Sequence, residues 1–367
     1  MLTTFRAEHV GSLLRPPELL QARAAHAEGR IKLDQLRVAE DRAILQVLEK
    51  QRKLGLDVVT DGEMRRGSWL TDMADAVEGF VPERVALEWK GPGGGVEGST
   101  AHAVGAKLRK VRKMTGHEVP YLKMATKGPF KVTLPAPSNF MLASYKTGIT
   151  DRFYPTHGDL LKDLVEIVRD DVQWLVSEGV QYIQFDAPYY SHYLDPRQRA
   201  QMRQAGLDPD KELEKAIAGD NAALRDVPGG GVTLALHVCR WNSRSRWYTE
   251  GGYDVIAEKL FGSLHVDRFL LEYDSDRSGG FEPLRLVPPD KTVVLGLITT
   301  KEPKLELQDE LQRRIDEAAK FVPLENLALS PQCGFASVAA GNLLSMDEQW
   351  KKLELVVNTA RKVWGTA

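Results

Sequence analysis

The sequence predicts an α/β protein, a single (β/α)8 TIM barrel with long inserted loops. Helical segments alternate with short strands rich in β-branched and aromatic residues, and about eight such strands can be counted along the 367 residues. This alternation favours a parallel sheet flanked by helices, and eight repeats favour a barrel over an open sheet. The chain is 43% hydrophobic, enough for a large core. We therefore expect one catalytic barrel domain over residues 1–367.

The clearest repeating unit is a helix, then a glycine, then a strand. In residues 158–178 apolar side chains recur at helical spacing, and Gly179 stands where a left-handed C-cap is expected. A helix ending at Gly55 repeats the pattern, and Ser345 with Glu348 forms a capping box that predicts a last helix. The strand candidates are residues 5–10, 57–60, 125–134, 182–185, 232–238, 268–273, 292–298 and 327–330.

Two stretches interrupt this alternation. Residues 84–120 contain a glycine-rich run and then a basic patch, and are expected to form an inserted hairpin or a long loop. Residues 194–230 are polar and glycine-rich at their end, and are expected to form a loop excursion over the barrel mouth. Solvated loops are the plain interpretation of both stretches, and a lid or a dimer contact is the alternative.

Composition excludes several classes of protein. The formal net charge is only -2, and no run of Lys and Arg suggests binding to nucleic acid or to an anionic membrane. The N-terminus lacks the pattern of a signal peptide, and no apolar stretch reaches the roughly 20 residues of a membrane span. We expect a soluble cytoplasmic protein. No Gly-x-Gly-x-x-Gly follows a strand, which weakens a dinucleotide-binding alternative.

The two cysteines are the most informative residues. A disulfide framework is implausible with so few, so burial, metal binding or catalysis must explain them. His237 and Cys239 lie two apart near the end of a strand and therefore point to the same side. Glu272 ends the next strand, and Cys333 follows the last one. All four are zinc-ligand types, and their wide separation along the chain indicates a catalytic site rather than a structural zinc knuckle.

Other strand ends carry polar residues that an apolar core would not need. Glu63 and Asp186 could bind a substrate ammonium group, and Ser12 its carboxylate. The plain alternative for Asp186 is a helix cap. For His9 it is a packed histidine hydrogen-bonded to a barrel carboxylate.

Five motifs carry a resemblance to a known family. Residues 9–16, 60–66, 236–240, 271–278 and 329–335 look like those of the short, single-barrel relatives of cobalamin-independent methionine synthase. The resemblance runs from His9 to Trp364 and covers only the C-terminal catalytic barrel of the full-length enzyme.

The resemblance implies zinc bound by His237, Cys239, Glu272 and Cys333. It also implies homocysteine bound by Ser12, Glu63 and Asp186. The full-length enzyme has a proton-relaying histidine after the seventh strand, whereas Lys301 stands near that position here. We take Lys301 and His9 as the candidate catalytic residues.

The sequence therefore predicts a zinc-dependent methyltransferase that converts homocysteine to methionine. The methyl donor would be methyltetrahydrofolate or a methylated corrinoid, free or on a corrinoid protein, and the protein could be a homo-oligomer. The first alternative is zinc-dependent alkyl transfer to another small thiol, such as the opening of an epoxide by coenzyme M. The sulfonate group of coenzyme M would favour cationic partners such as Arg15, Arg65 or Arg66. The second alternative, a degenerate barrel that only binds a thiol or a metal, is opposed by the intact ligand set.

Overall fold

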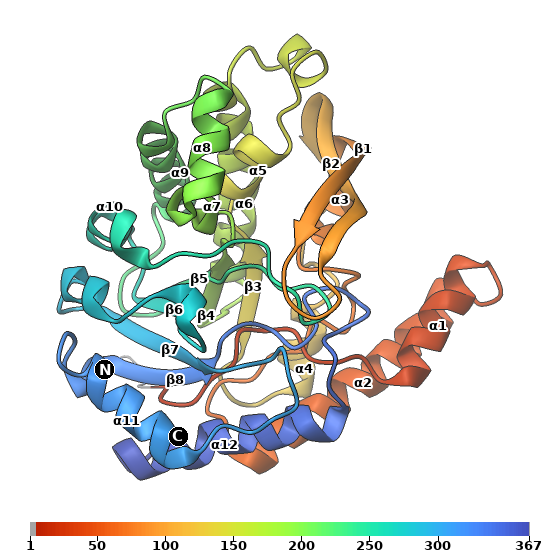
Figure 1. The fold of residues 1–367 in the computed structure, drawn as a ribbon. Helices are drawn as coiled ribbons and strands as arrows, with labels where there is room; N and C mark the ends of the chain where they lie inside the picture. Colours follow the sequence, from red (N-terminus) through yellow and green to blue (C-terminus); the bar gives the residue numbers. More distant parts are fainter. Residues whose placement is uncertain (1–4, 367) are drawn as a thin grey trace.

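A six-stranded parallel sheet forms the centre of the computed structural model (Figure 1), which describes residues 5–366, with backbone only at 71 and 72. Each strand pairs with the next one in the chain, so a crossover connection separates every neighbouring pair. The alternation of strands and helices in the sequence is thereby confirmed. The strands are β3 (Lys131–Pro135), β4 (Tyr182–Asp186), β5 (Thr233–Val238), β6 (Arg268–Glu272), β7 (Thr292–Ile298) and β8 (Leu327–Pro331).

The two N-terminal strand candidates extend this sheet by single bridges only. Ala7 bridges to Leu329 of β8, and Val59 bridges to Phe130 just before β3. The regular ladder therefore has six strands and does not close, whereas we predicted a closed eight-stranded barrel. At this edge the Gln51 side-chain amide bonds both the N–H and the C=O of Thr60, at 3.0 and 2.8 Å, as a neighbouring strand would.

Packing nevertheless joins the two edges of the sheet. One inner apolar cluster combines side chains from both edge segments with side chains from β4 to β8. Its members are Phe5, Val10, Val58, Tyr182, Ala235, Leu270, Val294 and Ala328. Because the strands are parallel, their carboxyl ends lie on one side of this cluster.

Three helix ends follow the predicted chemistry. Helix α6 (His157–Ser177) is followed by Gly179 at φ 78°, and α2 (Leu33–Leu54) by Gly55 at φ 94°. Both glycines hold left-handed conformations that would strain other residues. Helix α12 (Met346–Trp364) opens with the capping box of Ser345 and Glu348. These three helices are confirmed.

The first inserted stretch is a long antiparallel hairpin. Its strands are β1 (Val77–Trp89) and β2 (Gly95–Lys110), so it begins before residue 84, where we expected it. It stands beside the parallel sheet in Figure 1. The strand predicted from residue 125 begins only at Lys131, because residues 119–125 form helix α4 (Val119–Ala125).

The second stretch, residues 194–230, is mostly helical, and the prediction of a loop excursion is wrong. It contains α8 (Pro196–Gln204) and α9 (Pro209–Leu224), and α9 packs against α6. Asp195 and Asp208 are N-caps, and in each case the next residue is a proline at the first helical position. These Asp-Pro pairs are start signals that the polar composition obscured.

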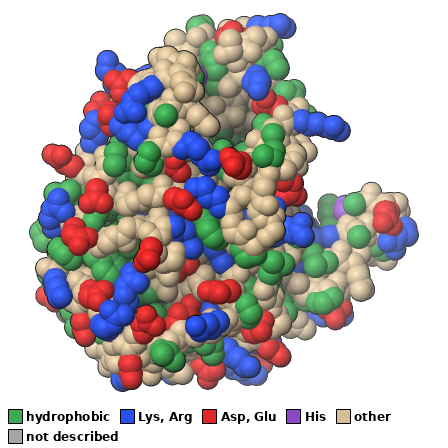
Figure 2. Space-filling model, in the orientation of Figure 1, with side chains coloured by type: hydrophobic (Ala, Val, Ile, Leu, Met, Phe, Trp, Pro, Cys, Tyr) green, Lys and Arg blue, Asp and Glu red, His purple; other side chains and the backbone are tan. Residues whose placement is uncertain are grey.

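Helices α1 and α2 form a hairpin whose tip projects from the body (Figure 1). In Figure 2 acidic and basic side chains alternate over the visible face. No helix within the described residues is long and apolar enough to cross a membrane. The remaining helices are α1 (Pro17–Ala27), α3 (Thr71–Ala76), α5 (Ser138–Ala143), α7 (Tyr190–Leu194), α10 (Ala257–Ser263) and α11 (Gln308–Ala318), with 3-10 turns at Thr150–Arg152, Tyr253–Val255, Asp276–Ser278, Glu282–Leu286 and Leu324–Asn326.

Candidate metal and thiol site

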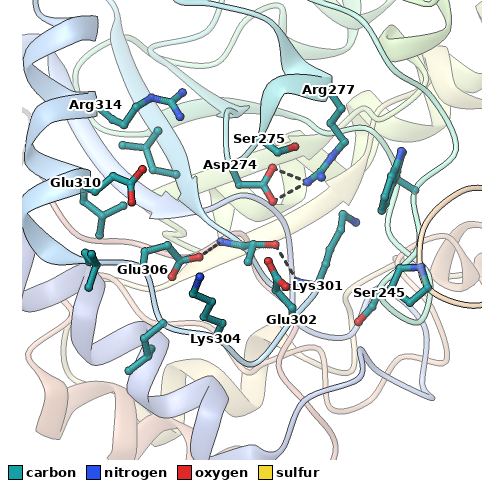
Figure 3. A pocket seen from close by; sticks show the side chains of 17 residues that line it. Ser245, Asp274, Ser275, Arg277, Lys301, Glu302, Lys304, Glu306, Glu310 and Arg314 are labelled. Carbon is teal, nitrogen blue, oxygen red and sulfur yellow. Dashed lines mark hydrogen bonds and ion pairs between the residues drawn. The ribbon is translucent and has the colours of Figure 1, made fainter.

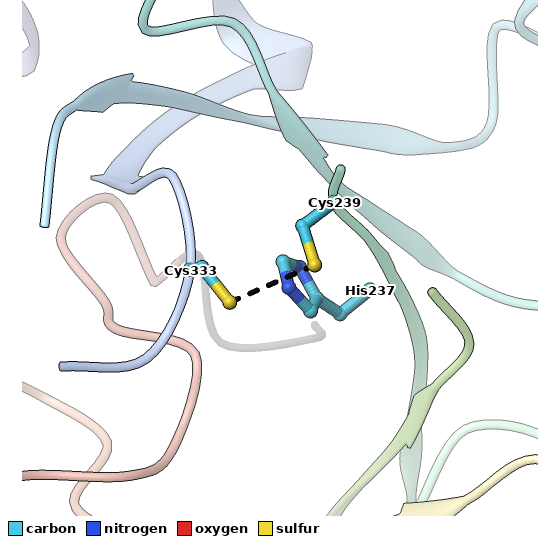
Figure 4. A group of neighbouring side chains, drawn as sticks. All are labelled: His237, Cys239 and Cys333. Atoms are coloured by element: carbon cyan, nitrogen blue, oxygen red, sulfur yellow. Dashed lines mark hydrogen bonds between the residues drawn. The ribbon is translucent and has the colours of Figure 1, made fainter. Parts of the chain in front are cut away.

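His237, Cys239 and Cys333 meet at the carboxyl end of the sheet (Figure 4). The alternation of side chains along β5 turns His237 and Cys239 to the same side. Cys333 comes from the turn that follows β8. The ligand atoms of the three residues lie within 4.8 Å of one another, and the two sulfur atoms are 3.7 Å apart. Three of the four predicted metal ligands are thus brought together.

The geometry of this cluster fits a tetrahedral zinc ion. With Zn–S bonds of about 2.3 Å, two thiolates on one tetrahedral zinc lie about 3.8 Å apart. His237 Nδ1 is 3.2 Å from the Leu270 carbonyl oxygen, to which it can donate, so Nε2 is left as the ligand atom. His237 Nε2 is buried and, within the described residues, has no hydrogen-bond partner. A metal ion bound to Nε2 would supply the missing partner.

The two thiols cannot easily ionise together. Contact with Cys333 and burial raise the pKa of the Cys239 thiol well above its usual value. Contact with Cys239 lowers the pKa of Cys333 well below its usual value, with help from His237 and against the effect of burial. A second thiolate at this distance requires a cation between the sulfurs, which is what a divalent metal provides.

Glu272, the fourth predicted ligand, lies beside the cluster rather than in it. Its Oε1 accepts a 2.6 Å hydrogen bond from Arg277, and its Oε2 accepts one of 2.7 Å from the backbone N–H of Arg240. Burial alone would raise the pKa of Glu272, but Arg277, Lys301 and Arg240 bring it below its usual value. The carboxylate is therefore ionised, as a metal ligand must be, but both of its oxygens accept hydrogen bonds from protein donors.

The three predicted substrate-binding residues line one cavity together with the cluster. Ser12, Glu63 and Asp186 share it with the three ligands. The cavity holds about 390 Å³ of empty space. The lining residues are Val10, Ser12, Glu63, Trp69, Asp186, Pro188, His237, Cys239, Trp241, Asn242, Cys333, Gly334 and Ser337.

Glu63 offers one carboxylate oxygen to this cavity. Its Oε1 accepts a 3.1 Å hydrogen bond from Thr133, while its Oε2 is buried and has no partner within residues 5–366. The backbone of Glu63 is left-handed, with φ 56°. Gly11 gives the side chain room, because a Cβ at that position would lie 2.8 Å from Oε1. An unpartnered buried carboxylate oxygen suits a substrate ammonium group.

Asp186 is held by a buried polar chain inside the sheet. Gln184 donates to Asp186 Oδ1 at 2.7 Å, and its amide oxygen accepts from Lys131 at 2.8 Å. Lys131 in turn pairs with Glu8 at 3.0 Å, and Arg268 pairs with Glu8 at 2.9 Å. Burial raises the pKa of Asp186 to about 7, an effect that His237 partly opposes.

The structure does not bring His9 into the cavity. Its Nε2 is 2.8 Å from Gln51 Oε1 on α2, on the outer side of the edge segment. Burial lowers the pKa of His9 to about 4, so the imidazole is neutral at pH 7. The partner is an amide and not the barrel carboxylate considered from the sequence.

Among the described residues Lys301 forms no hydrogen bond with the thiols, although its positive charge acts to lower the pKa of each. Its ammonium donates to the carbonyl oxygen of Trp241 at 3.1 Å, to Asn242 Oδ1 at 3.0 Å and to the carbonyl oxygen of Arg246 at 3.3 Å. It thereby ties down the loop after β5, which carries Trp241 into the cavity wall. Burial lowers the pKa of Lys301 below its usual value.

Lys301 belongs to the lining of a second, wider cavity (Figure 3). This cavity holds about 1340 Å³ of empty space, and acidic and basic side chains line it in equal measure. Two of the four acidic groups have partners within this lining: Arg277 bonds Asp274 at 2.6 Å, and Glu306 accepts from the Thr299 N–H at 2.8 Å. The candidate metal ligands line the smaller cavity.

Four residues around the site have no role in the sequence prediction. Trp69, Trp241 and Asn242 line the cavity, and Arg277 holds Glu272. Asn242 fixes the turn at Cys333 by donating to the Gly334 carbonyl oxygen at 2.7 Å. The only sequence signal is proximity, since Trp241 and Asn242 stand two and three residues after Cys239 and Arg277 lies within the motif of residues 271–278.

Comparison with known proteins agrees with the site. Residues 5–362 match the family described as cobalamin-independent synthase, catalytic domain. An uncharacterized protein of Bacillus subtilis, YxjH, is 38% identical over 98% of this chain and 95% of its own length. The methionine synthase of Sulfurisphaera tokodaii is 26% identical over 92% of this chain and 89% of its own length.

A solved structure of similar fold gives the same result. It is that of a candidate vitamin-B12-independent methionine synthase from Listeria monocytogenes, with 28% identity and a TM-score of 0.76, covering 100% of this chain and 99% of the other. The fold and site define a cobalamin-independent methionine synthase-like enzyme. The chain belongs to the cobalamin-independent synthase catalytic-domain family, as the motifs predicted.

Proposed function

We propose that this protein is a zinc-dependent methyltransferase that converts homocysteine to methionine. The observation that carries the proposal is one cavity in which His237, Cys239 and Cys333 face the acidic residues Glu63 and Asp186. One end suits a metal and a thiol, and the other end suits an ammonium group. The family match supports the same reaction.

Each end of the cavity has a defined task in this proposal. His237, Cys239 and Cys333 would hold the zinc ion, with Glu272 as the fourth ligand once its bonds to Arg277 and the Arg240 N–H are exchanged. When bound, the zinc ion supplies the positive charge that keeps a substrate thiol ionised at neutral pH. Glu63 and Asp186 bind the amino group, and Ser12 binds the carboxylate. Fixing both ends orients the sulfur toward the donor methyl group.

Charge around the cavity favours an amino acid over a sulfonate thiol. The three arginines that could bind a sulfonate do not line the cavity. Arg15 donates to the carbonyl oxygen of Glu63, and Arg65 pairs with Asp41. Arg66 pairs with Glu118 at 2.7 Å and lies 3.9 Å from Glu63 Oε1. The cavity presents carboxylates instead. This observation supports homocysteine over coenzyme M as the thiol, and methyltetrahydrofolate and methylated corrinoids remain the donors suggested by the family.

The test combines metal content with thiol binding. Purified protein should contain about one zinc ion per chain, and calorimetry should show binding of homocysteine but not of coenzyme M. Removal of zinc with a chelator should abolish the binding, and added zinc should restore it. Protein that binds homocysteine equally well without metal would contradict the proposal.

A further inference from the structure

Two tryptophans form one wall of the cavity that contains the thiols. Trp69 and Trp241 both line it, with ring centroids 6.3 Å apart and ring planes at 79°. Two rings that meet nearly at right angles form adjacent sides of an aromatic box. Trp241 also packs on Tyr189 and Tyr248, with centroids 4.8 and 5.8 Å away, so its place is fixed before any ligand binds.

The faces of these two rings carry no cationic side chain. Four of the other tryptophans each have an Arg or Lys over the ring, at 5.0 to 5.7 Å: Trp89, Trp247, Trp350 and Trp364. Within residues 5–366, neither Trp69 nor Trp241 has such a partner. The electron-rich face of an indole attracts cations, and methylated ammonium ligands are commonly bound this way. The pair therefore offers a cation site inside the cavity.

The other residues that line this cavity also favour a cationic ligand. Its ionisable groups are Glu63, Asp186, His237 and the two thiols, and no Lys or Arg is present among the described lining residues. After homocysteine and zinc are bound, the sulfur ligands still carry excess negative charge. An anionic donor would be repelled, whereas a cationic donor would be attracted. The narrowness of the cavity also favours a small molecule over a large ring system.

Building on the proposed homocysteine methyltransferase, we propose that the methyl donor is a small methylated onium cation, either a sulfonium or a quaternary ammonium compound, bound against Trp69 and Trp241. The homocysteine thiolate attacks the methyl carbon and forms the new S–C bond. The old bond from carbon to the positive sulfur or nitrogen breaks, and its electron pair stays on that atom. The leaving group departs as a neutral thioether or amine.

This reaction needs no proton donor, which suits the structure. A neutral tertiary amine donor would need a proton on its leaving nitrogen, whereas an onium donor does not. Lys301 directs its ammonium to Asn242 and to two loop carbonyl oxygens rather than into the cavity. Its task is then to hold the Trp241 loop, and not to deliver a proton.

Binding tests the aromatic site without turnover. Zinc-loaded protein saturated with homocysteine is titrated with dimethylsulfonioacetate and with glycine betaine, and tryptophan fluorescence is followed. The carbon isosteres 3-methylbutanoate and 3,3-dimethylbutanoate keep the carboxylate but lack the positive charge, and they serve as controls of equal shape. At least one cation should bind about tenfold more tightly than its isostere. Equal binding of cation and isostere would overturn the inference.

Variants locate the binding. Trp241→Leu and Trp69→Leu should each remove the preference for the cation, and Trp241→Phe should retain most of it because the ring remains. Trp174→Leu, on α6 and away from the cavity, is the matched control and should behave as the wild type. If Trp241→Leu is poorly folded, Trp69→Leu decides, since its ring lines the same cavity from another loop. An unchanged preference in a folded Trp69→Leu protein would overturn the inference.

Turnover separates this inference from the function on which it rests. Methionine formation is measured with the two onium donors, with methyltetrahydrofolate and with methylcobalamin, and homocysteine binding is measured independently by calorimetry. Methionine formed from a sulfonium or an ammonium donor supports the inference and identifies which of the two donor classes the protein uses. Homocysteine binding with methionine formed only from methyltetrahydrofolate or methylcobalamin overturns the inference and leaves the function intact. Failure of homocysteine to bind overturns both.

Discussion

Arg277 and Glu272 form a buried ion pair next to the thiol cluster, with 2.6 Å between Arg277 Nε and Glu272 Oε1. The Glu272 side chain is fully buried, and Arg277 also donates to Asp274 through Nη2. This arrangement keeps Glu272 ionised in the protein interior. It also means that Glu272 can become a metal ligand only by exchanging its protein donors.

Removing the cation should therefore destabilise the protein strongly. In Arg277→Met the Glu272 and Asp274 carboxylates lose their partner, and breaking such a buried pair costs about 3 kcal/mol or more. The matched control is Arg313→Met, whose pair with Glu317 on α11 is exposed and should contribute less than about 1 kcal/mol. Urea unfolding measures both. Equal stability of the two variants would contradict the assignment of Arg277 as the partner that holds Glu272.

The cysteine cluster predicts the metal content of the variants. Cys239→Ser and Cys333→Ser should each be purified with little zinc, because a neutral hydroxyl replaces an anionic ligand. Far-UV circular dichroism should stay unchanged, since both side chains lie at one end of a sheet that six regular strands already form. Plasma emission spectrometry measures the zinc. His265→Gln removes a histidine away from the cluster and should retain the full content.

The sequence was sufficient for those features that depend on local chemistry. The spacing of His237 and Cys239, the capping box at Ser345 and the glycines after α2 and α6 each act within a few residues. The helical state of residues 196–224 was also encoded locally, by Asp195 and Asp208 before prolines.

Features that depend on distant partners were not readable from the sequence. At the open edge of the sheet, Gln51 on α2 bonds the backbone groups of Thr60, a tertiary contact without a sequence signature. His9 turns to the same Gln51 and away from the cavity. Glu272 is held by Arg277, and the aromatic wall arises because the loop after Cys239 folds against Trp69. In each case the position of a side chain depends on a contact with a residue that is distant in the sequence.

Glu63 should determine the recognition of the amino group. In Glu63→Gln the charge-assisted contact with a substrate ammonium is lost, so the KM for homocysteine should rise about tenfold or more. The KM for 4-mercaptobutanoate, which is homocysteine without its amino group, should not change. Steady-state kinetics with both thiols gives the comparison, and Glu97→Gln on the exposed hairpin is the control. A parallel rise for both thiols would show that Glu63 acts on the fold rather than on the ammonium group.

His9 should make the protein less stable in acid. Its folded pKa of about 4 lies below the usual 6.5, so below pH 6.5 the unfolded chain binds a proton that the folded protein does not. Stability from this group is complete above pH 6.5 and falls as the pH drops toward 4, by about 2 kcal/mol between pH 7 and 5. Between pH 7 and 5 the His9→Gln variant should therefore lose about 2 kcal/mol less unfolding free energy than the wild type does. Urea unfolding at each pH measures the difference. Identical pH slopes for the wild type and the variant would mean that His9 is charged in the folded protein.

Lys301 should act through the loop that it holds. In Lys301→Met the Asn242 amide and two loop carbonyl oxygens lose a buried donor, which should cost about 2 kcal/mol or more of stability. Because the loop carries Trp241, the KM for the methyl donor should rise while the pH profile of kcat keeps its shape. Lys301→Arg keeps a cation and should restore part of the stability. If instead Lys301→Met keeps its stability and donor KM but loses a limb of the pH profile, Lys301 transfers a proton, as considered from the sequence.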